Sequence, residues 1–146
     1  MVADPVFVDT NVLVYATRPS AAQHASAQAA LARLESEGSS LWVSPQVLRE
    51  YLAVVTRPQA TAPALPMAAA ITDVQRFRAV FDVADERPNV LDRLLNLLTT
   101  NSSSGRQVHD ANIVATMLEH SIQRLLTFNA ADFRSFVGII DVEPLP

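Results

Sequence analysis

The sequence of 146 residues contains no cysteine, no lysine and only three glycines. The absence of cysteine excludes disulfides, thiolate zinc sites and cysteine nucleophiles, and it is typical of a reducing compartment. No run of about 18 uncharged apolar residues is present, so we expect no membrane-spanning helix. The amino terminus also lacks the basic and apolar segments of a secretory signal. We therefore expect a soluble, cytoplasmic protein.

The charged residues are few and mainly acidic. Fifteen acidic residues outnumber eleven basic ones, all of them arginine, which gives a formal net charge of −4. A domain that binds duplex DNA through counterion release is usually basic, so the composition disfavours a DNA-binding module. The planar fork of arginine nevertheless suits phosphate, and a few well-placed arginines can bind a nucleic-acid backbone.

Short apolar segments alternate with helical ones along the whole chain. We expect strands at residues 5–8, 41–43, 81–83, 124–127 and 138–141, and helices at residues 11–16, 24–37, 45–56, 67–80, 88–100 and 108–119. This alternation predicts an α/β fold, a three-layer sandwich with a mostly parallel sheet of four or five strands and helices on both faces. The length fits a single domain over residues 1–146.

Acidic side chains occur where the expected strands and helices meet. Asp9 follows the first buried strand, at the carboxyl end where open α/β sheets bind ligands. Glu50 lies on the helix that begins at Ser44-Pro45, a strong start signal with a serine cap and a proline in the first turn. Asp110 lies in the first turn of the helix at residues 108–119.

A second group of oxygen donors, Thr127, Asn129 and Asp132, follows the expected strand at residues 124–127. If this strand lies beside the strand at residues 5–8, the two groups meet at one edge of the sheet. Clustered carboxylates repel one another, and a hard divalent cation such as Mg²⁺ or Mn²⁺ relieves that repulsion. Such an ion activates water for phosphoester hydrolysis without a nucleophilic side chain.

Each acid also has a purely structural interpretation. Asp9 and Asp132 can cap helices, and Glu50 can be an ordinary solvated residue. Asp110 can stabilise its helix by lying near the positive end of the helix dipole. The metal-site hypothesis therefore depends on the combination of these residues.

Four segments of the chain resemble the motifs of PIN-domain nucleases. They are Phe7-Val8-Asp9-Thr10-Asn11-Val12-Leu13-Val14-Tyr15-Ala16, Ser44-Pro45-Gln46-Val47-Leu48-Arg49-Glu50-Tyr51, Val108-His109-Asp110-Ala111-Asn112-Ile113-Val114-Ala115 and Leu126-Thr127-Phe128-Asn129-Ala130-Ala131-Asp132-Phe133. Their order spans nearly the whole chain. Within the family, the sequence is most similar to the VapC ribonuclease toxins of type II toxin–antitoxin pairs.

This resemblance implies a catalytic set of Asp9, Glu50, Asp110, Asn129 and Asp132. Asp9 and Asp110 would be the principal Mg²⁺ ligands, and Glu50 would bind the metal directly or through water. Asn129 stands where many family members have a fourth acid, which weakens a second metal site, and Asp132 is the residue that can compensate.

The resemblance also implies roles for residues around these acids. Asn11 and Thr127 would orient carboxylates through hydrogen bonds. The RNA-binding candidates are Arg18, Arg57 and Arg106, and the substrate would be single-stranded or loop RNA, such as a tRNA or rRNA loop. His109 adjoins Asp110 but points about 100° away on a helix, so we expect a structural role for it.

The family further implies a cognate antitoxin, an amphipathic segment of which lies in a groove while its arginine enters the acidic site. A homodimer is a second expectation, because the helices that carry Leu48, Leu52 and Val55, or Leu31 and Leu34, present more apolar surface than one thin sheet covers.

Two other functions compete with the ribonuclease. A phosphatase of the haloacid-dehalogenase type also begins with an acid after a strand, but it needs a second aspartate where this chain has Asn11. A catalytically silent, PIN-like protein-binding module is the other alternative, and the missing charge at Asn129 favours it.

Overall fold

The computed structural model describes residues 4–60, 62–101 and 105–145 and contains a five-stranded sheet in the order β3-β2-β1-β4-β5, with every pair of neighbours parallel. The strands are β1 (Pro5–Val8), β2 (Ser40–Val43), β3 (Asp82–Val83), β4 (Arg124–Thr127) and β5 (Asp141–Pro144). The expected parallel sheet is therefore confirmed, and β1 and β4 are neighbours.

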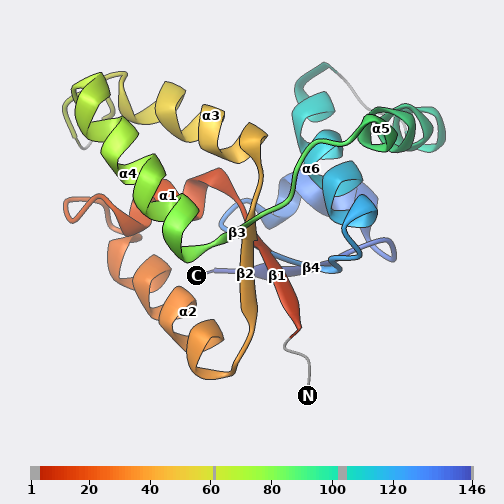
Figure 1. The fold of residues 1–146 in the computed structure, drawn as a ribbon, viewed down its shortest axis with the longest axis horizontal. Coiled ribbons are helices and arrows are strands. Elements are labelled where there is room, and N and C mark those ends of the chain that lie inside the picture. The colour runs from red at the N-terminus through yellow and green to blue at the C-terminus, as the bar shows by residue number, and fades with distance from the viewer. Residues whose placement is uncertain (1–3, 61, 102–104, 146) are drawn as a thin grey trace.

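Six α-helices connect these strands and cover the two faces of the sheet (Figure 1). They are α1 (Thr10–Ala16), α2 (His24–Ser36), α3 (Pro45–Val55), α4 (Met67–Val80), α5 (Pro88–Thr100) and α6 (Val108–Glu119), and two short 3₁₀ segments are η1 (Gly105–Gln107) and η2 (Ala130–Phe136). In Figure 1, α3 and α4 rise on the left of the view and α5 and α6 on the right, with the sheet between and below them. No helix in these described ranges has the length and apolar character that a membrane span needs.

The central strand β1 is buried on both faces of the sheet. Val6, Phe7 and Val8 have no exposed surface, because β2 and β4 flank the strand and helices cover both of its faces. A strand buried on both faces reads as a continuous apolar run, which is why β1 is recognisable from sequence. Its carboxyl end is thereby fixed in the middle of the sheet.

Local capping fixes the start of α3. The Ser44 hydroxyl accepts a hydrogen bond from the backbone N–H of Val47 at 3.3 Å, and Pro45 occupies the first turn. The Ser44-Pro45 start signal is confirmed, and it sets the position of Glu50 one and a half turns further along the helix.

The last strand begins later than the sequence predicts. We expected it at residues 138–141, but the backbone N–H groups of Ile139 and Ile140 bond back to the Phe136 carbonyl at 3.0 and 3.2 Å. Gly138 has a positive φ of 88° and allows this turn. The strand therefore begins at Asp141, whose N–H bonds to the Gln123 carbonyl at 2.7 Å.

The apolar helix faces that suggest a homodimer are largely buried within a single copy of the chain. Leu48, Val55 and Leu34 are buried in the core, and Leu31 and Leu52 pack against it partly buried. That argument for a dimer was wrong, because β2 and the neighbouring helices cover more of these faces than the spacing alone predicts. The exposed apolar side chains lie mainly on α4 and α5 and near η2, and those above half exposure are Met67, Val80, Leu91, Leu95 and Val137.

A buried hydroxyl joins three of the helices. The Tyr51 hydroxyl on α3 donates to Asp73 Oδ2 on α4 at 2.7 Å and lies 3.0 Å from Thr17 Oγ1 at the end of α1. Burial raises the pKa of the Tyr51 hydroxyl, so it stays protonated and remains a donor.

We expect Tyr51→Phe to lower the free energy of unfolding by about 1–2 kcal/mol, because Asp73 and Thr17 lose a partner in a partly buried site. Chemical denaturation measures this difference. The matched control is Tyr15→Phe, at a partly exposed ring, for which we expect a change within about 0.5 kcal/mol. Equal effects of the two changes would contradict this account of the helix junction.

Candidate active site

A cavity of about 360 Å³ opens at the carboxyl edge of the sheet, where β1 and β4 end. The described residues that line it include the whole predicted catalytic set: Asp9, Glu50, Asp110, Asn129 and Asp132. Four segments that are far apart in the sequence therefore meet in one place, as the motif order predicts.

Asp9 is the most constrained of these side chains and is only 7% exposed. Its Oδ1 accepts a hydrogen bond from the N–H of Thr10 at 2.8 Å, so it also caps α1. Its Oδ2 accepts from the Thr127 hydroxyl at 2.8 Å and from Asn11 Nδ2 at 3.2 Å. Asp9 thus caps α1, as its structural interpretation predicts, and it also lines the cavity.

Thr127 and Asn11 connect the ends of β1 and β4 around Asp9. Asn11 Nδ2 donates to the Thr127 hydroxyl at 3.2 Å, and Asn11 Oδ1 accepts from the N–H of Phe128 at 3.0 Å. Thr127 has no exposed surface and also accepts from the N–H of Asn129. These contacts hold the Asp9 carboxylate in one orientation, as expected for residues that position it.

Burial and mutual repulsion raise the pKa values of two carboxyl groups in the cavity. Burial raises the pKa of Asp9 to about 6, and hydrogen bonds from Thr127 and Thr10 only partly offset this. Burial also raises the pKa of Asp110 to about 6, and the negative charges of Asp9, Asp132 and Glu50 add to it. The cavity therefore concentrates negative charge that nearby protein groups do not neutralise.

Hydrogen bonds to both carboxylate oxygens hold Glu50 in place. Its Oε2 accepts from the Thr10 hydroxyl at 3.0 Å, which links α3 to the start of α1. Its Oε1 accepts from Gln46 Nε2 at 3.0 Å, one helical turn earlier on the same face of α3. Thr10 and Gln46 were not among the predicted site residues.

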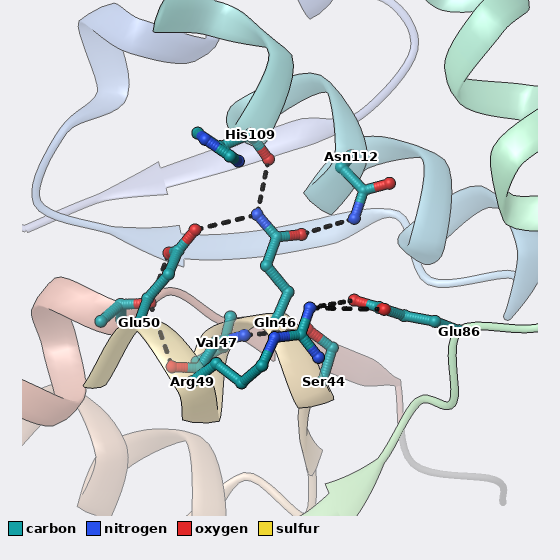
Figure 2. Close-up of polar contacts among 9 residues, drawn as sticks. Ser44, Gln46, Val47, Arg49, Glu50, Glu86, His109 and Asn112 are labelled. Carbon is teal, nitrogen blue, oxygen red and sulfur yellow. Dashed lines mark hydrogen bonds and ion pairs between the residues drawn. The ribbon is translucent and has the colours of Figure 1, made fainter. Parts of the chain in front are cut away.

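Gln46 connects the two helices that carry Glu50 and Asp110. Figure 2 shows its side chain extending from α3 to α6, where Nε2 donates to the His109 carbonyl at 2.8 Å and Oε1 accepts from Asn112 Nδ2 at 2.7 Å. Only 5% of Gln46 is exposed, and both ends of its amide are paired. A polar residue four positions before Glu50, and so on the same buried helix face, is the sequence signal that could have identified it.

The structural role of the His109 side chain stays a prediction. Its backbone carbonyl accepts from Gln46, while its side chain lies on an exposed part of α6. Asp132 lies within η2, and the cap position of that segment is Asn129, so Asp132 is not the cap.

The donor atoms suit a hard divalent cation, whose ligands are carboxylate and amide oxygens. The carboxylates do not all converge on one point, however: within residues 4–60, 62–101 and 105–145, no three Asp, Glu, His or Cys side chains are close enough to share an ion. A cation would thus contact at most two of these acids directly in this arrangement, and water would complete its shell. Mg²⁺ usually keeps several waters and is bound by one or two carboxylates, so the residues present fit this ion. In this arrangement Glu50 would contact the ion through water.

The three predicted RNA-binding arginines differ in position. Arg57 lines the cavity and is exposed. Arg18 does not face solvent, and its assignment was wrong: it is 7% exposed and its guanidinium donates to the carbonyls of Pro63 and Val55, both at 3.0 Å. It pins the loop after α3 onto the end of α1. The side chain of Arg106 lies outside the described part of the structure.

The parallel α/β sandwich and the carboxylates that line the cavity where β1 and β4 end agree with the PIN-domain fold that the sequence motifs predict. The PIN domain family model matches residues 6–137, so the chain belongs to the PIN domain family. No curated protein sequence matches the chain significantly.

Several solved structures share this fold. The chain aligns with Mycobacterium tuberculosis VapC20, a sarcin–ricin loop cleaving toxin, with a TM-score of 0.71 and 22% identity over 95% of this chain and 99% of that one. The VapBC2 complex from Rickettsia felis, bound to a DNA fragment from its promoter, aligns with a TM-score of 0.70 and 16% identity over 97% and 99%. VapBC-1 from nontypeable Haemophilus influenzae aligns with a TM-score of 0.67 and 14% identity over 96% and 97%. These likenesses confirm the PIN fold.

The raised pKa values predict a pH-dependent stability. Without divalent cations, the contributions of Asp9 and Asp110 are fully present below about pH 4 and are lost as the pH rises through about 6, because the folded chain holds these protons more tightly than the unfolded chain. Asp9 accounts for about 3 kcal/mol of the unfolding free energy that is lost over this pH range.

We expect Asp9→Asn and Asp110→Asn to flatten the fall in unfolding free energy between about pH 4 and pH 7, measured by denaturant titration in EDTA. Asp92→Asn, at an exposed position on α5, is the matched control and should leave the slope unchanged. A slope that is the same in all three variants would contradict the assignment of these protons.

Removal of the Gln46 amide should destabilise the junction between α3 and α6. We expect Gln46→Leu to cost about 1–3 kcal/mol in unfolding free energy, because Glu50, Asn112 and the His109 carbonyl each lose a partner. Gln28→Leu is the control, since Gln28 donates to the Ala16 carbonyl at an exposed site. If the two variants unfold at the same denaturant concentration, the connecting role of Gln46 is wrong.

Proposed function

We propose that this protein is a metal-dependent endoribonuclease that hydrolyses RNA phosphodiester bonds, and that it is the toxin of a type II toxin–antitoxin pair acting in the cytoplasm. The proposed cofactor is Mg²⁺, with Mn²⁺ as a substitute. The observation that carries the proposal is the cavity that Asp9, Glu50, Asp110 and Asp132 all line, with raised pKa values at Asp9 and Asp110. Buried carboxylates without compensation are costly, and a divalent cation is their usual partner.

The proposed roles follow from how each side chain is held. Asp9 and Asp110 would ligate the cation directly, and Glu50 would orient a water of its shell. A bound divalent cation activates water and stabilises the charge that develops on a phosphodiester. Thr127 and Asn11 would keep the Asp9 carboxylate aimed into the cavity.

Asn129 and Asp132 form the part of the cavity that departs from the family pattern. Asn129 supplies an amide oxygen without charge, so a second cation there would bind more weakly. Asp132 lies close enough to Asp110 to raise the pKa of that carboxyl group, and it would supply the missing charge.

The proposed substrate is single-stranded or loop RNA, such as a loop of tRNA or rRNA, because only unpaired bases leave the backbone accessible to a recessed acidic site. The description of VapC20 as a sarcin–ricin loop cleaving toxin supports this substrate class. Arg57, at the cavity wall, would contact a phosphate.

The proposed protein partners are a cognate antitoxin and a second copy of the chain. The structural neighbours that are VapBC complexes support an antitoxin. An arginine from such a partner would pair with the carboxylates of the cavity and block the binding of RNA. Exposed apolar pairs one turn apart, Met67 with Ile71 on α4 and Leu91 with Leu95 on α5, supply surfaces for these contacts.

The proposal is tested by cleavage of structured RNA by the purified protein, resolved on denaturing gels. Mg²⁺ should support cleavage and EDTA should abolish it. Asp9→Asn and Asp110→Asn should each lower the rate at least about 100-fold, since each removes a proposed ligand, whereas Asp92→Asn should not change it.

Three results would contradict the proposal. Cleavage that survives EDTA or both substitutions would place the activity elsewhere. Mg²⁺ binding without cleavage would favour the silent PIN-like module. Release of inorganic phosphate from small monoesters, with RNA left intact, would favour a phosphatase.

A further inference from the structure

The acidic cavity continues past the carboxylates along the facing sides of α1 and α3. The described residues that line this second half are Val14, Tyr15, Ala53, Val54, Arg57 and Gln59. They supply an aromatic ring, a cation, an amide and an aliphatic surface, and they include no carboxylate. This half of the cavity therefore has a chemistry different from that of the acidic half.

Arg57 supplies the positive charge of this region. Its Nε donates to the Ala53 carbonyl at 2.8 Å, which fixes the guanidinium against the end of α3. The ion pairs found among residues 4–60, 62–101 and 105–145 do not include Arg57. Its terminal nitrogens are thus available for an anion beside a cavity that is otherwise acidic.

Tyr15 supplies a fixed aromatic wall. Its ring meets Phe128 edge to face, with 5.1 Å between centroids and an interplanar angle of 87°, and the side chain stays partly exposed. Its backbone carbonyl accepts from His24 Nδ1 at 2.8 Å, which holds the end of α1 in place. A ring held in this way loses little conformational freedom when a flat ligand packs against it.

Gln59 completes the region with one defined acceptor. Its Nε2 donates to the carbonyls of Val54 and Arg57 at 2.7 and 3.1 Å, so the amide is oriented and Oε1 remains as an acceptor. Val14, Ala53 and Val54 supply the apolar surface of this region.

We propose that this half of the cavity is a subsite for one nucleotide of single-stranded RNA, adjacent to the phosphate in the acidic half. The base packs against Tyr15 and the apolar surface, an N–H of the base donates to Gln59 Oε1, and the neighbouring phosphate pairs with Arg57. The identity of the ligand rests on the proposed ribonuclease function.

The subsite selects unpaired RNA for a physical reason. A base that packs against Tyr15 must leave its stack, which costs little in a loop or single strand and much in a duplex. The acidic half repels phosphates unless a cation is bound, so Arg57 is the side chain that draws the backbone toward this end.

The experiment measures binding of a short fluorescein-labelled single-stranded RNA of mixed sequence by fluorescence anisotropy at several salt concentrations. All variants carry Asp9→Asn, so that binding is recorded without cleavage. Circular dichroism confirms that each variant is folded.

Two matched pairs of variants isolate the subsite. Arg57→Gln should reduce the slope of log affinity against log salt by about 0.7, the share of one phosphate contact on a single strand, whereas Arg49→Gln on α3 should not. Arg49 is the control because its ion pair is with Glu86, outside the cavity (Figure 2). Tyr15→Leu should weaken binding about tenfold, whereas Tyr15→Phe keeps the ring and should bind normally.

Equal salt slopes for the two arginine variants, or equal affinities for the two tyrosine variants, would overturn the subsite. It is also overturned if the changes leave RNA binding intact and weaken binding of the cognate antitoxin instead, because the surface then serves a protein. Cleavage by the chain with Asp9 intact is measured separately. If this chain does not cleave RNA but the variants bind RNA as expected, the nuclease proposal is refuted and the RNA subsite is still supported.

Discussion

The burial of one carboxylate, Asp9, is the constraint on which the rest of the site depends. The side chain lies at the end of the buried central strand β1, where β4 on one side and α1 on the other leave almost no access to water. Hydrogen bonds from Thr127, Asn11 and Thr10 hold it there, yet the pKa of Asp9 remains raised to about 6. The fold therefore maintains a buried negative charge that it only partly compensates, at a cost to its own stability.

The surrounding contacts extend this arrangement to the other acids. Thr10, next to Asp9, bonds to Glu50 on α3, and Gln46 then links α3 to the first turn of α6, which carries Asp110. A chain of short hydrogen bonds thus runs from the middle of the sheet to both flanking helices. Because every link is buried or partly buried, a shift of either helix would leave polar groups unpaired, and these contacts therefore hold the two helices that carry Glu50 and Asp110 in place.

The sequence predicts those parts of this structure that follow from local rules. The apolar run of β1, the Ser44-Pro45 start of α3 and the acids at element ends each carry a local signal, and parallel strands bring their carboxyl ends to one edge. Arg18 carries no such signal, and the place of Gln46 one turn before Glu50 does not indicate its partners. In both cases the partners lie on distant segments: Gln46 pairs with Asn112, and Arg18 donates to the carbonyls of Val55 and Pro63. An arginine at a loop looks the same in sequence whether it binds phosphate or backbone carbonyls.

The central claim is that the carboxylates around Asp9 hold a divalent cation, and anomalous diffraction from crystals soaked in Mn²⁺ tests it most directly. The account predicts an anomalous peak within about 2.5 Å of carboxylate oxygens of both Asp9 and Asp110, with water between the ion and Glu50. Mn²⁺ found only on isolated surface carboxylates, with no peak between Asp9 and Asp110 at saturating Mn²⁺ and neutral pH, would contradict it.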